Sequence, residues 1–126
     1  NLIKSEDDIS SKIYRLYNAA FSRFPDKSGL QYWIDKNISG ENTYKQTANS
    51  FLISKEFTST YGINSSNSEY ITNLYSNVLS RNPDANGFEY WSNQIERGLE
   101  DRSDLLIGFA ESDENKSTFL GETNII

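Results

Sequence analysis

The chain has 126 residues, which suits a single domain, and its 13% aromatic content is enough for a packed core. The net charge of −6 argues against binding to nucleic acid phosphates, and no apolar run approaches the roughly 20 residues of a membrane-spanning helix. Cys and His are both absent, which removes disulfides, zinc–thiolate sites and the usual nucleophile–base pairs of catalysis.

The first predicted helix begins near residue 9. Its apolar side chains follow the spacing i, i+3, i+4, i+7, i+8, which gives one continuous stripe on a helix. The stripe consists of Ile13, Leu16, Tyr17, Ala20 and Phe21. The preceding pattern Ser5-x-x-Asp8 resembles a capping box, so we expect the helix to start there. Thr43-x-x-Gln46 and Ser66-x-x-Glu69 are capping-box candidates for later helices.

A second helix is predicted from Pro25, because a proline in the first helical turn loses no hydrogen bond. Asp26 then places a negative charge near the positive end of the helix dipole, and Gly40 fits a left-handed residue near the C-terminal end. A third helix follows Thr43, and Ser54 is a candidate cap for a short final helix to about Tyr61.

The same pattern recurs 58 residues later in the chain. Residues 22–33 and 80–91 both read S-R-x-P-D-x-x-G-x-x-Y-W, and the offset continues without a gap to Gly98 and Phe109. No stretch alternates persistently as a strand would. We therefore predict one all-α domain over residues 1–126, a bundle of about six helices. It would be built from two tandem, pseudo-symmetric three-helix repeats, at about 9–62 and 67–120, packed face to face.

The repeated polar residues of the motif have two interpretations. Arg23 and Arg81 each precede a repeated aspartate, Asp26 or Asp84, by three residues. The arginine could close over that aspartate, or over Glu56, as a structural ion pair. Alternatively, arginine and aspartate together could present a polar ligand site. The structural interpretation is favoured, and the four residues remain candidates for ligand binding.

The repeated aromatic pairs divide by helix face. Trp33 and Trp91 lie on the apolar stripe and are predicted to belong to the core. Tyr32 and Tyr90 point roughly 100° away from them, so we expect exposed or half-exposed rings. An exposed aromatic face can stack on a sugar, which makes these two tyrosines candidate glycan contacts.

No catalytic constellation stands out, so the chain is predicted not to be an enzyme and no cofactor is expected. Calcium is a candidate ion, because Glu6-Asp7-Asp8 and Glu111-x-Asp113-Glu114 offer carboxylate oxygens. Neither cluster has the spacing of an EF-hand loop, and a solvated helix terminus is the favoured interpretation.

The motif L-x-R-x-P-D-x-x-G-x-x-Y-W with a later S-x-E-F resembles the bacterial domain of unknown function family 4214. The first copy matches it at residues 21–33 and 54–57, and the second at 79–91 and 112–115. The second copy departs at Asn115, where the motif has phenylalanine, so its final helix is expected to dock differently. The resemblance covers roughly residues 9–119.

The resemblance implies an all-helical module of large secreted or surface-layer proteins, distantly similar to phycobilisome linker domains. It implies a non-catalytic, extracellular role in anchoring or interaction at the bacterial cell surface. Surface polysaccharide, either lipopolysaccharide or capsule, is the first expected partner, and neighbouring protein subunits are the alternative. No catalytic residue is carried over, and neither nucleic acid binding nor membrane insertion is expected.

Overall fold

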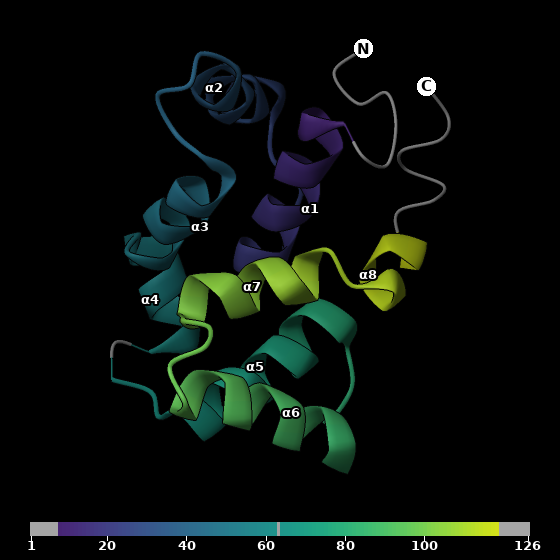
Figure 1. The fold of residues 1–126 in the computed structure, drawn as a ribbon. Coiled ribbons are helices and arrows are strands. Elements are labelled where there is room, and N and C mark those ends of the chain that lie inside the picture. Colours follow the sequence, from purple (N-terminus) through teal and green to yellow (C-terminus); the bar gives the residue numbers. More distant parts are fainter. Residues whose placement is uncertain (1–7, 63, 119–126) are drawn as a thin grey trace.

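The computed structural model describes residues 8–62 and 64–118, and within them all regular structure is helical (Figure 1). The helices are α1 (Ile9–Phe21), α2 (Lys27–Ile38), α3 (Tyr44–Leu52), α4 (Lys55–Tyr61), α5 (Asn67–Leu79), α6 (Ala85–Glu96), α7 (Arg102–Ala110) and α8 (Asp113–Thr118). The all-α prediction is confirmed, but the number of helices in the described residues is eight rather than about six, because a fourth, short helix ends each copy. Each helix of the second copy begins 58 residues after its counterpart, as Asn67 does after Ile9.

The helix starts follow from side chains that cap exposed backbone N–H groups. Thr43 and Ser66 form complete capping boxes with Gln46 and Glu69, as the sequence predicts. The prediction for the second helix is off by two residues, because Pro25 lies outside α2 and Asp26 is its N-cap. The candidate cap Ser5 lies outside the described residues, and Asp8 itself caps α1.

The S-R segment of the motif contains a turn that the sequence pattern does not reveal. Ser22 ends α1 and Ser80 ends α5, and both have a left-handed backbone, with φ of 55° and 57°. This conformation is uncommon for a residue with a side chain, and it reverses the chain directly before the arginine. Gly40 and Gly98 also have positive φ, as expected.

The main core lies where α1, α3, α5 and α7 meet. In Figure 1, α7 crosses the middle of the molecule, with α1 above it and α5 and α6 below. The largest fully buried apolar side chains come from both copies: Tyr70, Phe51, Phe109, Ile13, Leu16, Ile71, Leu74, Leu105 and Leu106. The two copies therefore share one core, since neither half encloses these side chains alone.

Contacts between the copies are unequal. α7 packs extensively against α1 and α3, whereas α3 makes no comparable contact with α5. The Arg15 side chain, only 1% exposed, donates hydrogen bonds of 2.9 and 2.8 Å to Glu111 at the end of α7. The positions equivalent to this pair are Asn73 and Ile53, so no such ion pair forms on the other side.

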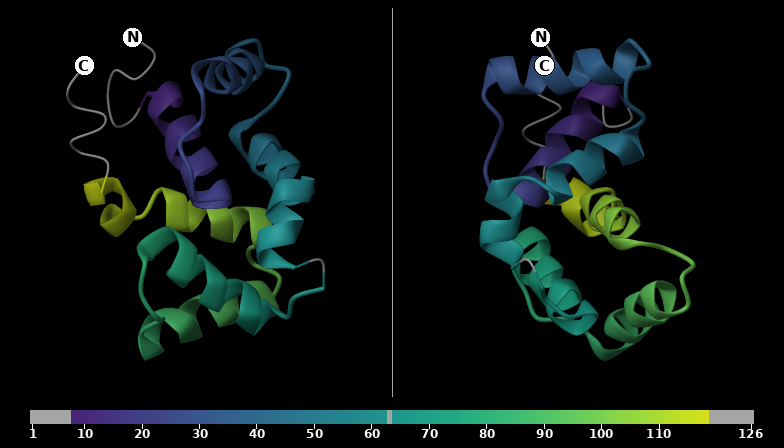
Figure 2. Two further views of the ribbon diagram at one scale, coloured as in Figure 1. Left: turned by 180° about the vertical axis from the view of Figure 1, so that it is seen from behind. Right: turned by 90° about the vertical axis from the view of Figure 1, so that its left-hand side faces the viewer.

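The second helix of each copy lies at an opposite end of the molecule (Figures 1 and 2). α2 covers a small second core through buried Leu30 and Ile34. α6 has no fully buried residue, and its Trp91 packs over Gly108 of α7. Both ends expose the outward faces of these helices to solvent.

Candidate functional site

The predicted site residues fall into two groups, and the first is occupied by internal contacts. Arg23 donates two hydrogen bonds to Glu56, of 2.9 and 3.0 Å, and its guanidinium lies 5.0 Å from the ring centre of Tyr17. The hydrogen bond with Glu56 raises the pKa of Arg23. This pair ties the turn after α1 to α4, which is the structural interpretation of the motif.

Arg81 repeats this arrangement in the second copy. It donates two hydrogen bonds of 2.9 Å to Glu114 and one of 3.2 Å to Asp84, and it lies 4.9 Å from the ring centre of Tyr75. The hydrogen bonds from Arg81 lower the pKa of Glu114. Both arginines are therefore engaged within the fold, and neither offers an unpaired cation to a ligand.

The two aspartates of the motif act as helix caps. Asp26 accepts a hydrogen bond of 2.9 Å from the Gly29 backbone N–H, and Asp84 accepts one of 2.9 Å from Gly87. The Gly87 N–H, and then Arg81, hold the pKa of Asp84 below its ordinary value. A Cβ at Gly29 would collide with the Asp26 carboxylate, and a Cβ at Gly87 would collide first with the Tyr75 hydroxyl and then with the Asp84 carboxylate.

The second group, Tyr32 and Tyr90, is open to solvent as the sequence predicts. The two side chains are 53% and 54% exposed. Each ring meets the following tryptophan edge-on, at 4.9 Å for Trp33 and 5.0 Å for Trp91. The tryptophans are half-buried against Phe51 and Phe109 of the core, so each exposed ring rests on a fixed support.

The surroundings of Tyr90 include polar residues that the motif alone does not identify. Asn86, Asn93 and Gln94 lie at positions i−4, i+3 and i+4, which are its neighbours on one face of α6. Gln94 donates a hydrogen bond of 3.0 Å to Glu100. Across residues 8–62 and 64–118, the side chains of Asn86 and Asn93 make no hydrogen bond, so both amides are available.

Tyr32 has different neighbours at the same positions: Ser28, Asp35 and Lys36. Ser28 donates to Asp26, and Asp35 accepts from Gln31 at 2.7 Å. The Lys36 ammonium lies 5.3 Å from the ring centre of Tyr32, and its pKa is raised by a hydrogen bond with Glu41. Polar groups therefore surround both rings, but those around Tyr32 already have partners.

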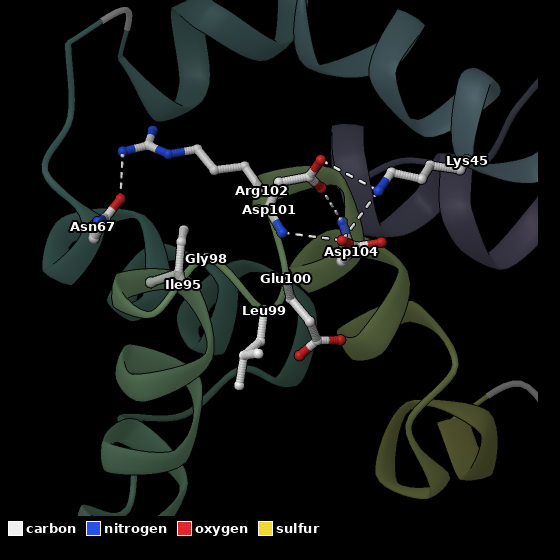
Figure 3. A pocket seen from close by; sticks show the side chains of 9 residues that line it. All are labelled: Lys45, Asn67, Ile95, Gly98, Leu99, Glu100, Asp101, Arg102 and Asp104. Carbon is white, nitrogen blue, oxygen red and sulfur yellow. Dashed lines mark hydrogen bonds and ion pairs between the residues drawn. The ribbon is translucent and has the colours of Figure 1, made fainter.

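A separate pocket of about 440 Å³ lies at the junction of the two copies (Figure 3). On one side, Lys45 of α3 pairs with Asp101 and Asp104 at 3.2 and 3.1 Å. On the other, Arg102 donates a hydrogen bond of 3.1 Å to Asn67. Lys45 thus ties α3 to the start of α7, and Arg102 ties the start of α7 to the segment before α5, so the lining of the pocket stabilises this junction.

Two of the described carboxylates considered for calcium form ion pairs with arginine. Glu111 pairs with Arg15, and Glu114 pairs with Arg81. The described part of the chain holds no group of three or more acidic residues placed to ligate a metal. Glu6 and Asp7 lie outside the described residues. Among the described helices, none is long and apolar enough to cross a membrane.

Over the residues that the structure describes, the chain is an all-helical domain that carries the S-R-x-P-D-x-x-G-x-x-Y-W motif twice. The family model described as "Domain of unknown function (DUF4214)" matches residues 48–119, more than half of the chain. The chain therefore belongs to this family, as the motif suggests. No curated protein and no solved structure matches the chain.

Proposed function

We propose that this domain is a non-catalytic, extracellular interaction module that binds cell-surface glycan within a larger surface or secreted protein. The tandem arrangement of two repeats is part of the proposal, because each repeat supplies one exposed tyrosine. The observation that carries the proposal is that these two rings are half-exposed at equivalent positions. Each ring packs edge-on against the tryptophan that follows it.

The chemistry around the rings suits a sugar. A pyranose presents C–H groups on one face, which pack on an aromatic ring, and hydroxyls at its edge, which hydrogen-bond to amides and carboxylates. Tyr90 has the unbonded amides of Asn86 and Asn93 one turn away on either side. An aromatic ring flanked by two side-chain amides can bind and orient a sugar without any charged contact.

A sedimentation assay with the isolated domain tests the proposal. Purified bacterial lipopolysaccharide and capsular polysaccharide serve as ligands, with calcium and with a chelator. We expect binding that Tyr90→Ala and Asn93→Ala weaken while the helical circular dichroism spectrum is retained. Asn49→Ala, at an exposed position of α3 and outside both α2 and α6, is the matched control for Asn93→Ala. Failure of the wild-type domain to bind either polysaccharide under both conditions would refute the proposal.

The alternative is a protein assembly module, and exposed aliphatic side chains favour it. Ile53 is 83% exposed, Ile38 69% and Leu99 64%. Exposed apolar side chains indicate a contact with a partner protein where they join into one patch larger than a few hundred Å². Replacing all three by serine would abolish such an assembly and leave polysaccharide binding unchanged, so the two functions give opposite results in one variant.

A further inference from the structure

We infer that the domain is a two-ended bridge, in which Tyr32 on α2 and Tyr90 on α6 bind two different glycan chains and so cross-link them. This inference rests on the proposed function and adds the number, placement and relative strength of the sites. It follows from the positions of the two exposed tyrosines in the fold.

The two rings belong to helices at opposite ends of the molecule. α2 packs against α1 and α3, whereas α6 packs against α5. The three views agree that α2 and α6 form opposite ends, with α1 and α7 between them (Figures 1 and 2). The tyrosines therefore do not form one combined site, and a sugar bound to one ring does not contact the other.

The body between the two ends is closely packed. α1 and α7 pack closely, and the Arg15–Glu111 ion pair connects them in the centre. Each tyrosine is in turn tied to this body through its tryptophan and a core phenylalanine. Two sites on one body let a single domain hold two chains at once, and once two coated surfaces are joined by one domain, further bridges between them form at a raised effective concentration.

The two sites differ in strength for a local reason. The ammonium of Lys36 lies over the Tyr32 ring, whereas the equivalent position beside Tyr90 is Gln94. Ser28 and Asp35 are also hydrogen-bonded beside Tyr32, while Asn86 and Asn93 are available beside Tyr90. We therefore expect the α6 end to bind more tightly than the α2 end.

Aggregation of coated beads by the intact domain tests whether the domain cross-links two glycan chains. Beads carry purified bacterial lipopolysaccharide, and both domain binding and bead aggregation are measured. The wild-type domain should bind and aggregate the beads at intermediate concentration and lose aggregation in excess domain. Tyr32→Ala and Tyr90→Ala should each bind without aggregating, Tyr90→Ala with the weaker affinity. The double variant should not bind, and Ile53→Ala should behave as wild type.

The outcomes separate the two proposals. Binding by the wild type without aggregation, or aggregation that survives either single substitution, would overturn the bridge and leave the proposed function standing. Complete loss of binding in one single variant would show one site and also overturn the bridge. If the wild type binds neither these beads nor beads coated with capsular polysaccharide, the proposed function fails, and the bridge fails with it.

Discussion

At the scale of single residues, the repeated motif separates into structural and exposed positions. Arg23, Asp26 and their counterparts close turns and cap helices, because every one of these side chains has an internal partner. Tyr32 and Tyr90 are the motif residues that combine large apolar area with exposure. Residue type and spacing predicted this division into structural and exposed positions. They did not decide whether Arg23 pairs with Asp26 or with Glu56, because Glu56 lies 33 residues from Arg23.

The cation over the Tyr32 ring gives a prediction at this scale. Lys36→Gln copies the second repeat, where Gln94 stands, and removes an ammonium that competes with a sugar for the ring face. We expect the affinity of the Tyr32 site, measured by calorimetry in a Tyr90→Ala background, to rise about threefold. Glu41→Gln frees Lys36 from its ion pair without removing it, so this control should show no such gain. An unchanged or lower affinity in Lys36→Gln would contradict the account of the ring environment.

A pH dependence follows from Asp101. The Ser103 hydroxyl, then the Asp104 N–H and Lys45, lower the pKa of Asp101 from 3.8 to about 2. A carboxylate with a lowered folded-state pKa stabilises the fold above its unfolded value, and this contribution disappears as the pH falls through the folded value. The urea concentration at the midpoint of unfolding should therefore decrease as the pH is lowered from about 4 to about 2. The decrease should be less steep in Asp101→Asn. Equal slopes in both proteins would refute this role for Asp101.

At the scale of helices, capping patterns were the most reliable signals. The Thr43 and Ser66 boxes are local and were predicted correctly, because donor and acceptor lie within four residues. Pro25 was misplaced because proline also suits the residue before an N-cap, and only the Asp26 side chain decides where the helix begins. The short final helix from Ser54 to about Tyr61 was predicted correctly as α4, but the count of about six helices did not include these short helices.

The docking of α6 on α7 depends on one small residue. A Cβ at Gly108 would lie 2.6 Å from the Trp91 ring, which is too close for contact. Gly108→Ala gains about 1 kcal/mol in helix propensity but must displace the ring, at about 1–3 kcal/mol. We expect a net loss of unfolding free energy of about 1 kcal/mol and a red shift of tryptophan emission. Ser50→Ala, the equivalent change in α3, should be neutral or stabilising, and no shift in Gly108→Ala would contradict this contact.

At the scale of the whole molecule, the asymmetry between the copies could not be predicted from the repeat. Arg15 and Glu111 are 96 residues apart, and neither stands out in a local pattern. The buried amide of Asn115 donates to the Ala110 carbonyl at 2.7 Å, where Phe57 of the first copy stacks on Tyr61, but α8 packs against α5 and α7 as α4 packs against α1 and α3, so the expected difference in docking is not seen. The repeated sequence pattern therefore predicted the fold that both copies share. The residues that differ between the copies determine how the copies pack together.

Breaking the central ion pair should weaken the joint between the copies. Glu111→Ala leaves the Arg15 guanidinium buried without its main partner, at a cost on the order of 3 kcal/mol. Chemical denaturation should show this loss, and Glu111→Gln should lose less because its amide oxygen still accepts a hydrogen bond. The exposed pair Arg81–Glu114 provides the control, since Glu114→Ala should cost far less. Equal losses in Glu111→Ala and Glu114→Ala would contradict the central role of Arg15.

Chemical-shift mapping is the measurement that tests the central claim most directly. The labelled domain is titrated with core oligosaccharide released from bacterial lipopolysaccharide, and the backbone amide shifts of the chain of 126 residues are followed. The account predicts shifts that cluster around Tyr90 on α6 at low ligand and around Tyr32 on α2 at higher ligand. Shifts confined to the Lys45–Asp101 pocket or to Ile38, Ile53 and Leu99, or no shifts at all, would contradict it.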